Sequence, residues 1–141
     1  IDTAKAKCAT LGGECDILVS IHHNGSTDDP SVNYTQVFVT QKKDVALGEA
    51  LYNRLLGLGL EGNGVKNDGF GITVYGGLVS ALTKAYFITN DTEAQPYFLG
   101  DMTRVNQEAD LLLAGIEDYF GSQSGGGGGN CSPGQHKQGK C

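Results

Sequence analysis

Residues 16–25 read Asp-Ile-Leu-Val-Ser-Ile-His-His-Asn-Gly, and this stretch decides the fold. The apolar run over 17–21 predicts a short buried strand, and the Asn24-Gly25 pair is typical of a turn. Between them stand His22 and His23. In α/β proteins ligands gather beyond the carboxyl ends of strands, so a strand that ends in imidazoles is a candidate metal or catalytic site. Two solvated histidines in a turn are the alternative interpretation.

The neighbouring segments alternate between helical and strand patterns. Before the strand, residues 2–12 predict a helix that ends at Gly12-Gly13. After a polar loop, residues 35–41 are rich in β-branched and aromatic side chains, which predicts a second strand. Asp44 is the predicted cap of a helix over 44–58. Four leucines give this helix one apolar face: Leu47, Leu51, Leu55 and Leu58.

The second half continues the alternation. Residues 72–75 and 80–87 predict two further strands, and residues 90–94 predict the start of a helix with acidic residues where the helix dipole favours them. Asp101 is the predicted cap of a long helix that reaches Phe120. Its predicted core stripe follows the helical period: Val105, Ala109, Leu112, Leu113, Ile116, Tyr119 and Phe120.

This order of elements predicts an α/β domain with helices on both faces of a mostly parallel or mixed sheet. The length of 141 residues suits one domain. We expect the domain to cover residues 1–121. Residues 122–141 form a separate Gly-rich tail with a cysteine-closed loop, and we expect this tail to pack on the domain or on a neighbouring subunit.

Charge and hydropathy exclude two classes of partner. The net charge of −6, with no large cluster of Lys and Arg, argues against nucleic-acid binding. No apolar run is long enough for a membrane span. The chain starts at Ile1 without a methionine, and we therefore expect it to be processed or to be part of a longer protein.

The cysteines predict an oxidising environment. Cys8 and Cys15 form one local pair, Cys131 and Cys141 another, and neither has the short spacing of a zinc site. Disulfides are the simpler interpretation. Three connectivities are open, of which the two local loops are favoured. The predicted location is extracellular or in the cell envelope.

Several motifs, in order, resemble the zinc-dependent N-acetylmuramoyl-L-alanine amidases. Residues 16–24 resemble the family's "AD-hydrophobic-SIHxN" segment, residues 64–66 its "RGVK" segment, and residues 81–90 followed by Glu93-Ala94 its "PAVLVEVGFISN…EA" segment. The end of the last helix, residues 115–120, fits the closing "GI..YF" pattern. The resemblance covers residues 2–121, the C-terminal two-thirds of the family's catalytic domain, and so implies an amidase-like fold without its N-terminal strands.

The resemblance also implies a chemistry. The family hydrolyses the amide between the lactyl group of N-acetylmuramic acid and L-Ala of peptidoglycan. Zinc held by two His and one Glu activates a water, and a further Glu takes the proton of that water. Here His22 matches the second His ligand, with His23 as an alternative, and Lys84 stands where the proton-accepting Glu is expected. The other two ligands would precede Ile1.

Three functional interpretations follow from the resemblance. The first is the amidase domain of a cell-wall hydrolase, inactive as this chain because Lys84 replaces the catalytic Glu and ligands are missing. The second is an extracellular structural or assembly subunit that reuses the fold and associates through an uncovered sheet edge and the tail. The third is a wall-binding pseudoenzyme that still holds stem peptides.

Overall fold

The computed structural model describes residues 1–124. The predicted Cys131–Cys141 loop and the predicted packing of the tail lie outside these residues. The α/β prediction is confirmed. The sheet contains β1 (Ile17–Asn24), β2 (Tyr34–Val39), β3 (Glu61–Asn67) and β4 (Val79–Phe87), in the order β1-β4-β2-β3. β1 and β4 are parallel, β2 and β3 are parallel, and β2 and β4 are antiparallel, which makes the sheet mixed.

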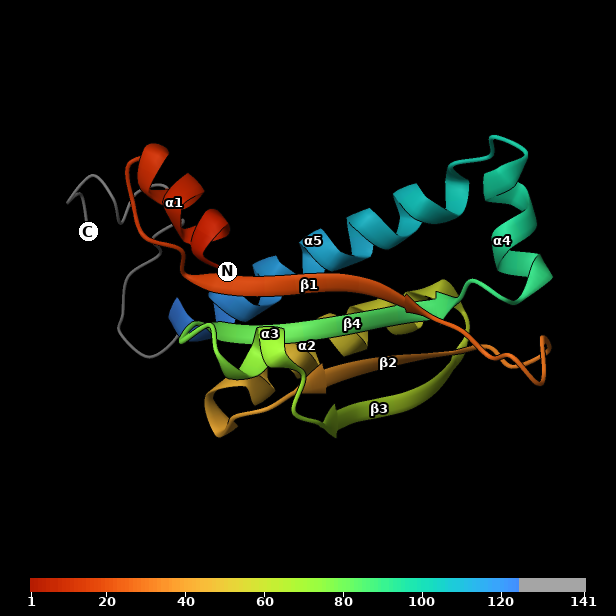
Figure 1. Cartoon of the computed structure of the whole chain (residues 1–141), viewed down its shortest axis with the longest axis horizontal. Helices are drawn as coiled ribbons and strands as arrows, with labels where there is room; N and C mark the ends of the chain where they lie inside the picture. Colours follow the sequence, from red (N-terminus) through yellow and green to blue (C-terminus); the bar gives the residue numbers. More distant parts are fainter. Residues whose placement is uncertain (125–141) are drawn as a thin grey trace.

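The longer helices cover one face of this sheet, and a short helix contacts the other (Figure 1). α2 (Val45–Leu55) and α5 (Thr103–Ser124) pack together behind the sheet, while α3 (Gly71–Val74) lies in front of β4. The remaining helices are α1 (Asp2–Thr10), α4 (Asp91–Phe98) and the 3-10 turns η1 (Lys42–Asp44) and η2 (Leu56–Leu58). Among residues 1–124, no helix combines the length and the apolar character that a membrane crossing requires.

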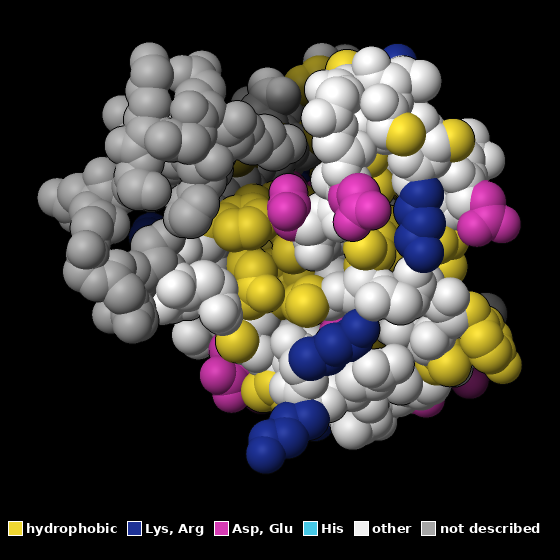
Figure 2. Space-filling model, turned by 90° about the vertical axis from the view of Figure 1, so that its left-hand side faces the viewer, with side chains coloured by type: hydrophobic (Ala, Val, Ile, Leu, Met, Phe, Trp, Pro, Cys, Tyr) yellow, Lys and Arg dark blue, Asp and Glu magenta, His cyan; other side chains and the backbone are white. Residues whose placement is uncertain are grey.

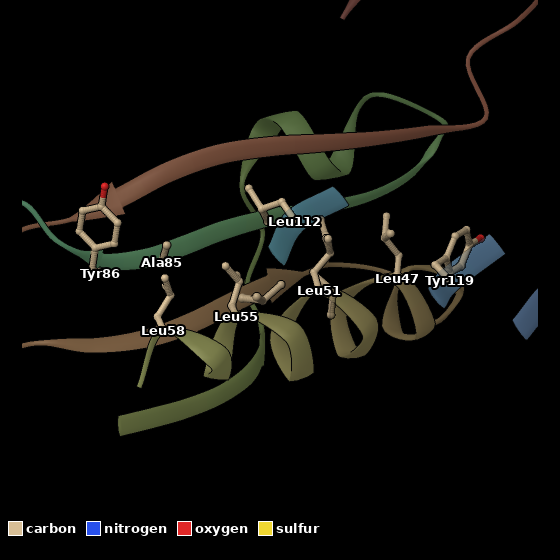
Figure 3. Close-up of a cluster of buried hydrophobic side chains, with 11 residues drawn as sticks. Leu47, Leu51, Leu55, Leu58, Ala85, Tyr86, Leu112 and Tyr119 are labelled. Carbon is tan, nitrogen blue, oxygen red and sulfur yellow. The ribbon is translucent and has the colours of Figure 1, made fainter. Parts of the chain in front are cut away.

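The core lies between the two long helices and the sheet, as the leucine spacing predicts. Leu47, Leu51 and Leu55 are fully buried. Figure 3 shows them gathered with Leu112 and Tyr119 of α5 against one face of the sheet. Burying each such side chain contributes roughly 1.5–3 kcal/mol, so this cluster stabilises the packing of the helices on the sheet.

In the middle of the chain one predicted element is wrong, and one strand lies where none is predicted. Residues 72–75, predicted as a strand, belong mainly to α3, because the N–H groups of Thr73 and Val74 bond the carbonyl of Phe70 (2.9 and 3.0 Å). The strand is instead β3, whose Gly and Asn residues gave no strand pattern. β3 depends on tertiary pairing with β2, and Asn63 donates a hydrogen bond to Gln36 (3.0 Å).

Two details of the helix predictions also need correction. The core stripe of α5 does not include Ala109 or Leu113, which are exposed, and it passes instead through Glu108 and Gly115. Asp44 is buried, but its carboxylate accepts the N–H groups of Gln41 (2.8 Å) and Ser80 (3.0 Å) instead of one from α2. It therefore ties η1 to β4.

Candidate functional site

The sheet brings His22 and Lys84 side by side. They are Cα partners in the parallel ladder of β1 and β4, and cross-strand partners project from the same face of a sheet. His22 is exposed, and its Nε2 lies 3.0 Å from the hydroxyl of Ser20. His22 and Lys84, the two positions that match site residues of the family motifs, therefore lie next to each other near the carboxyl end of β1.

The half-buried Lys84 ammonium has aromatic neighbours and no carboxylate partner. Its Nζ donates a hydrogen bond to Oδ1 of Asn24 (3.3 Å) and lies 5.4 and 5.6 Å from the ring centroids of Phe38 and Phe70. The rings themselves pack edge to face at 5.0 Å. At these distances the ring faces attract the cation. No ion pair involves Lys84 within residues 1–124.

His23 points to the opposite face, because side chains alternate along a strand. Its Nε2 lies 2.8 Å from Oε2 of Glu108, and its ring packs on Tyr86 with centroids 4.2 Å apart. Glu108 is only 4% exposed. The structure thus separates His23 from His22 and assigns it a partner on α5.

Sequence reasoning missed Glu108, although a signal was present. Glu108 stands three residues after Val105 and four before Leu112, on the apolar stripe itself. A carboxylate at such a position must find a hydrogen-bond partner, because burying an unpaired charge is costly. His23 supplies that partner.

An ion pair anchors α4 beside this histidine. Arg104 bonds Glu93 through Nε (2.6 Å) and Nη2 (2.7 Å), and it donates to the carbonyl of Leu58 (2.8 Å). Burial alone raises the pKa of Glu93, but hydrogen bonds from Arg104 and Asn33 together with the charge of Arg104 outweigh it, so the pKa lies below its ordinary value. Glu93, which belongs to the "EA" segment, therefore has a structural role: its carboxylate pairs with Arg104.

An apolar pocket of about 400 Å³ opens on this helix-covered side. Its lining includes the following residues: His23, Tyr86, Ile88, Glu93, Ala94, Tyr97, Phe98 and Val105. Burial, followed by the charge of Glu108, raises the pKa of Tyr86 to about 12, so its hydroxyl stays protonated at neutral pH. The pocket does not include His22 or Lys84.

The described residues do not fit the zinc ion that the resemblance implies. Within residues 1–124, no group of three or more His, Cys, Asp or Glu side chains is placed to hold a metal. His22 has the Lys84 ammonium as its cross-strand partner, and a fixed positive charge there opposes binding of a dication. Figure 2, which views the end where β1 and β4 begin, shows none of the described histidines.

One predicted disulfide is present. Cys8 and Cys15 are bonded, with their Cα atoms 5.5 Å apart, and the bond links α1 to the segment before β1. The pairing of Cys131 with Cys141 stays a prediction.

Comparison with known proteins identifies the fold. No protein-family model and no curated protein sequence matches this chain. Among solved structures, it resembles the catalytic domain of CwlV, an N-acetylmuramoyl-L-alanine amidase of Paenibacillus polymyxa, with a TM-score of 0.70, 20% identity, and coverage of 84% of this chain and 64% of that one. The N-acetylmuramoyl-L-alanine amidase AmiC2 of Nostoc punctiforme has a TM-score of 0.69 and 21% identity, with coverage of 85% of this chain and 65% of that one. An N-acetylmuramoyl-L-alanine amidase of Clostridium difficile has a TM-score of 0.71 and 19% identity, with coverage of 86% of this chain and 64% of that one. The chain thus has the fold of amidase catalytic domains and spans about two-thirds of their length.

Proposed function

We propose that this chain is a cell-envelope domain that binds peptidoglycan through an amidase fold and does not hydrolyse it. The fold and the ordered motifs support the link to peptidoglycan, and the Cys8–Cys15 disulfide supports a location outside the cytoplasm. The observation that carries the proposal is the pairing of Lys84 with His22. It puts a cation where zinc-dependent hydrolysis needs a proton acceptor, directly beside the residue that matches a metal ligand.

The chemistry explains why this pairing matters. Zinc hydrolases keep three protein ligands and an open position for water, and a nearby base takes the proton of that water. A protonated ammonium has no lone pair to accept a proton, and it raises the energy of a neighbouring dication. His22 itself remains exposed beside Lys84.

The test combines three measurements on the chain. We expect it to sediment with purified peptidoglycan, to retain far less than one zinc per chain after dialysis, and to release no stem peptides above a no-protein control. Lysozyme-treated peptidoglycan without added chain gives the background of soluble fragments. Stoichiometric zinc together with release of stem peptides would falsify the proposal, and so would failure to sediment.

A second candidate function is assembly through the sheet edge. β1 is the outermost strand on its side, and none of the described strands pairs with its outer edge. Ile21, near the end of β1, is 58% exposed. A long edge strand with apolar residues can accept a strand from another chain. Size-exclusion chromatography and electron microscopy test this: ordered oligomers support assembly, whereas a strictly monomeric particle rejects it.

A further inference from the structure

We infer that Lys84, Asn24 and His22 form a carboxylate-binding site, which takes an anion where zinc-dependent relatives would hold a cation. The inference rests on the proposed function and deepens it, because it names the chemical group through which a peptide is held.

The first argument is that the Lys84 ammonium lacks an anion. An ammonium has three N–H donors, and within residues 1–124 the one hydrogen-bond acceptor of Lys84 is Oδ1 of Asn24, at the long distance of 3.3 Å. The two arginines of the described chain differ: Arg104 bonds Glu93 and Arg54 bonds Asp118. Lys84 is thus a half-buried cation with hydrogen-bonding capacity left over.

The second argument is the aromatic support of the cation. Phe38 and Phe70 flank the Nζ atom at 5.4 and 5.6 Å. The rings hold the ammonium in place and keep water from part of its surface. A lower local dielectric strengthens its attraction to an anion, so this ammonium is a better anion partner than a fully solvated lysine.

The third argument is that further donors lie beside it. Because Oδ1 of Asn24 accepts the hydrogen bond from Lys84, the Nδ2 group of that side chain is left to donate elsewhere. His22 is exposed on the same face as the cross-strand partner of Lys84. A carboxylate has two acceptor oxygens, which matches one cation with polar side chains next to it.

The net charge of the chain favours a ligand that carries a single negative charge. At a net charge of −6, the protein repels polyanions at long range. A single cation cannot compensate for several phosphates, whereas it neutralises one carboxylate. The ligand class that fits is therefore a short peptide with a free carboxylate.

The experiment titrates the ¹⁵N-labelled chain with N-acetyl-alanyl-alanine and, separately, with its carboxamide. We expect amide shifts at residues 22–24 and 84, and binding of the free acid at least about tenfold tighter, since a hydrogen bond to a charged group contributes roughly 1.5–3 kcal/mol. Lys84→Met should remove this preference. Lys43→Met is the matched control, because the Lys43 ammonium bonds the carbonyl of Gly77 at the other end of β4.

Equal affinity for acid and amide overturns the inference, and this comparison needs no variant. Unchanged acid binding by a folded Lys84→Met chain overturns it as well. Failure of the carboxylate-site inference is distinguishable from failure of the proposed function. If the chain sediments with peptidoglycan but binds the acid and the amide equally, the proposed function stands and the carboxylate site is rejected. Acid preference without sedimentation supports the site and rejects the function.

Discussion

His22 and His23 are adjacent in the sequence but have different chemical surroundings. His22 lies on the open face beside Lys84, and His23 lies on the helix-covered face against Glu108. The cause is the alternation of side chains along β1. One residue of displacement in the register would exchange their roles, so the pairing of Ser20 with Leu82 and of Ile21 with Thr83 determines which histidine contacts which surface.

The Arg104–Glu93 ion pair is the polar contact whose loss we expect to cost most. Arg104→Met leaves a carboxylate with a side chain only 4% exposed without its cation. Breaking a buried pair by removing one partner costs about 3–5 kcal/mol. Urea unfolding monitored by circular dichroism should show a loss of this size.

Arg54→Met is the control for that variant, because it removes the same charge from a pair whose side chains are 47% and 46% exposed. We expect a loss below about 1 kcal/mol. The carboxyl of Glu93 has a lowered pKa, so its contribution is present above the ordinary pKa and is lost as the pH falls through the lowered value. The two variants should therefore converge in acid. Equal losses at neutral pH would contradict this account of Arg104.

At the scale of elements, the sequence predicts segments whose pattern is local and misses those that depend on partners. The leucine face of α2 is confirmed, and the apolar run over 17–21 does form a strand, the first part of β1. The prediction that this strand is buried is wrong: Ser20 is its one buried residue and Ile21 is 58% exposed, because β1 lies at the edge of the described sheet. β3 has no such pattern and forms because it pairs with β2, where the Gln36 side chain also accepts a hydrogen bond from Asn63. His22 and Lys84 could be selected by motif, whereas the His23–Glu108 contact joins residues far apart in the chain and required the fold.

The crossing of α2 and α5 depends on Gly115, part of the closing "GI..YF" pattern. A Cβ atom at this position would lie 2.9 Å from Cα of Leu51 and 3.2 Å from the carbonyl oxygen of Ala50. These are backbone atoms, so the helices themselves would have to separate. We expect Gly115→Ala to destabilise the protein by about 1–3 kcal/mol in urea unfolding.

Gly121→Ala is the matched control on the same helix. No atom lies within 4 Å of a Cβ atom built at this exposed position. Because alanine favours helices, the change should stabilise the protein by up to about 1 kcal/mol. If both substitutions stabilise, close helix contact is not the reason for glycine at position 115.

At the scale of the whole molecule, the polar groups form two separate surfaces. The Lys84 surface lies on the open sheet face, and the His23–Glu108 pair with its apolar pocket lies on the α5 side. The sheet between them is filled by buried residues such as Ala81 and Thr83. A ligand on one surface therefore does not contact the other directly.

The Cys8–Cys15 disulfide holds a helix that the core does not. α1 buries none of its residues, and a helix of 9 residues is marginal by itself. Replacing both cysteines by serine should abolish hydrogen-exchange protection in α1. The most protected amides of β4 should keep their opening free energy within about 0.5 kcal/mol. Retained protection in α1 would show that other contacts suffice to hold it.

The pairing of β1 with β4 also determines when the fold can form. Ile17 pairs with Val79 and Asn24 with Phe87, so the β1–β4 pairing, the one that β1 makes within residues 1–124, waits until β4 has been synthesised. Closing so long a loop is slow, and a nascent chain carries the apolar β1 uncovered for much of its synthesis.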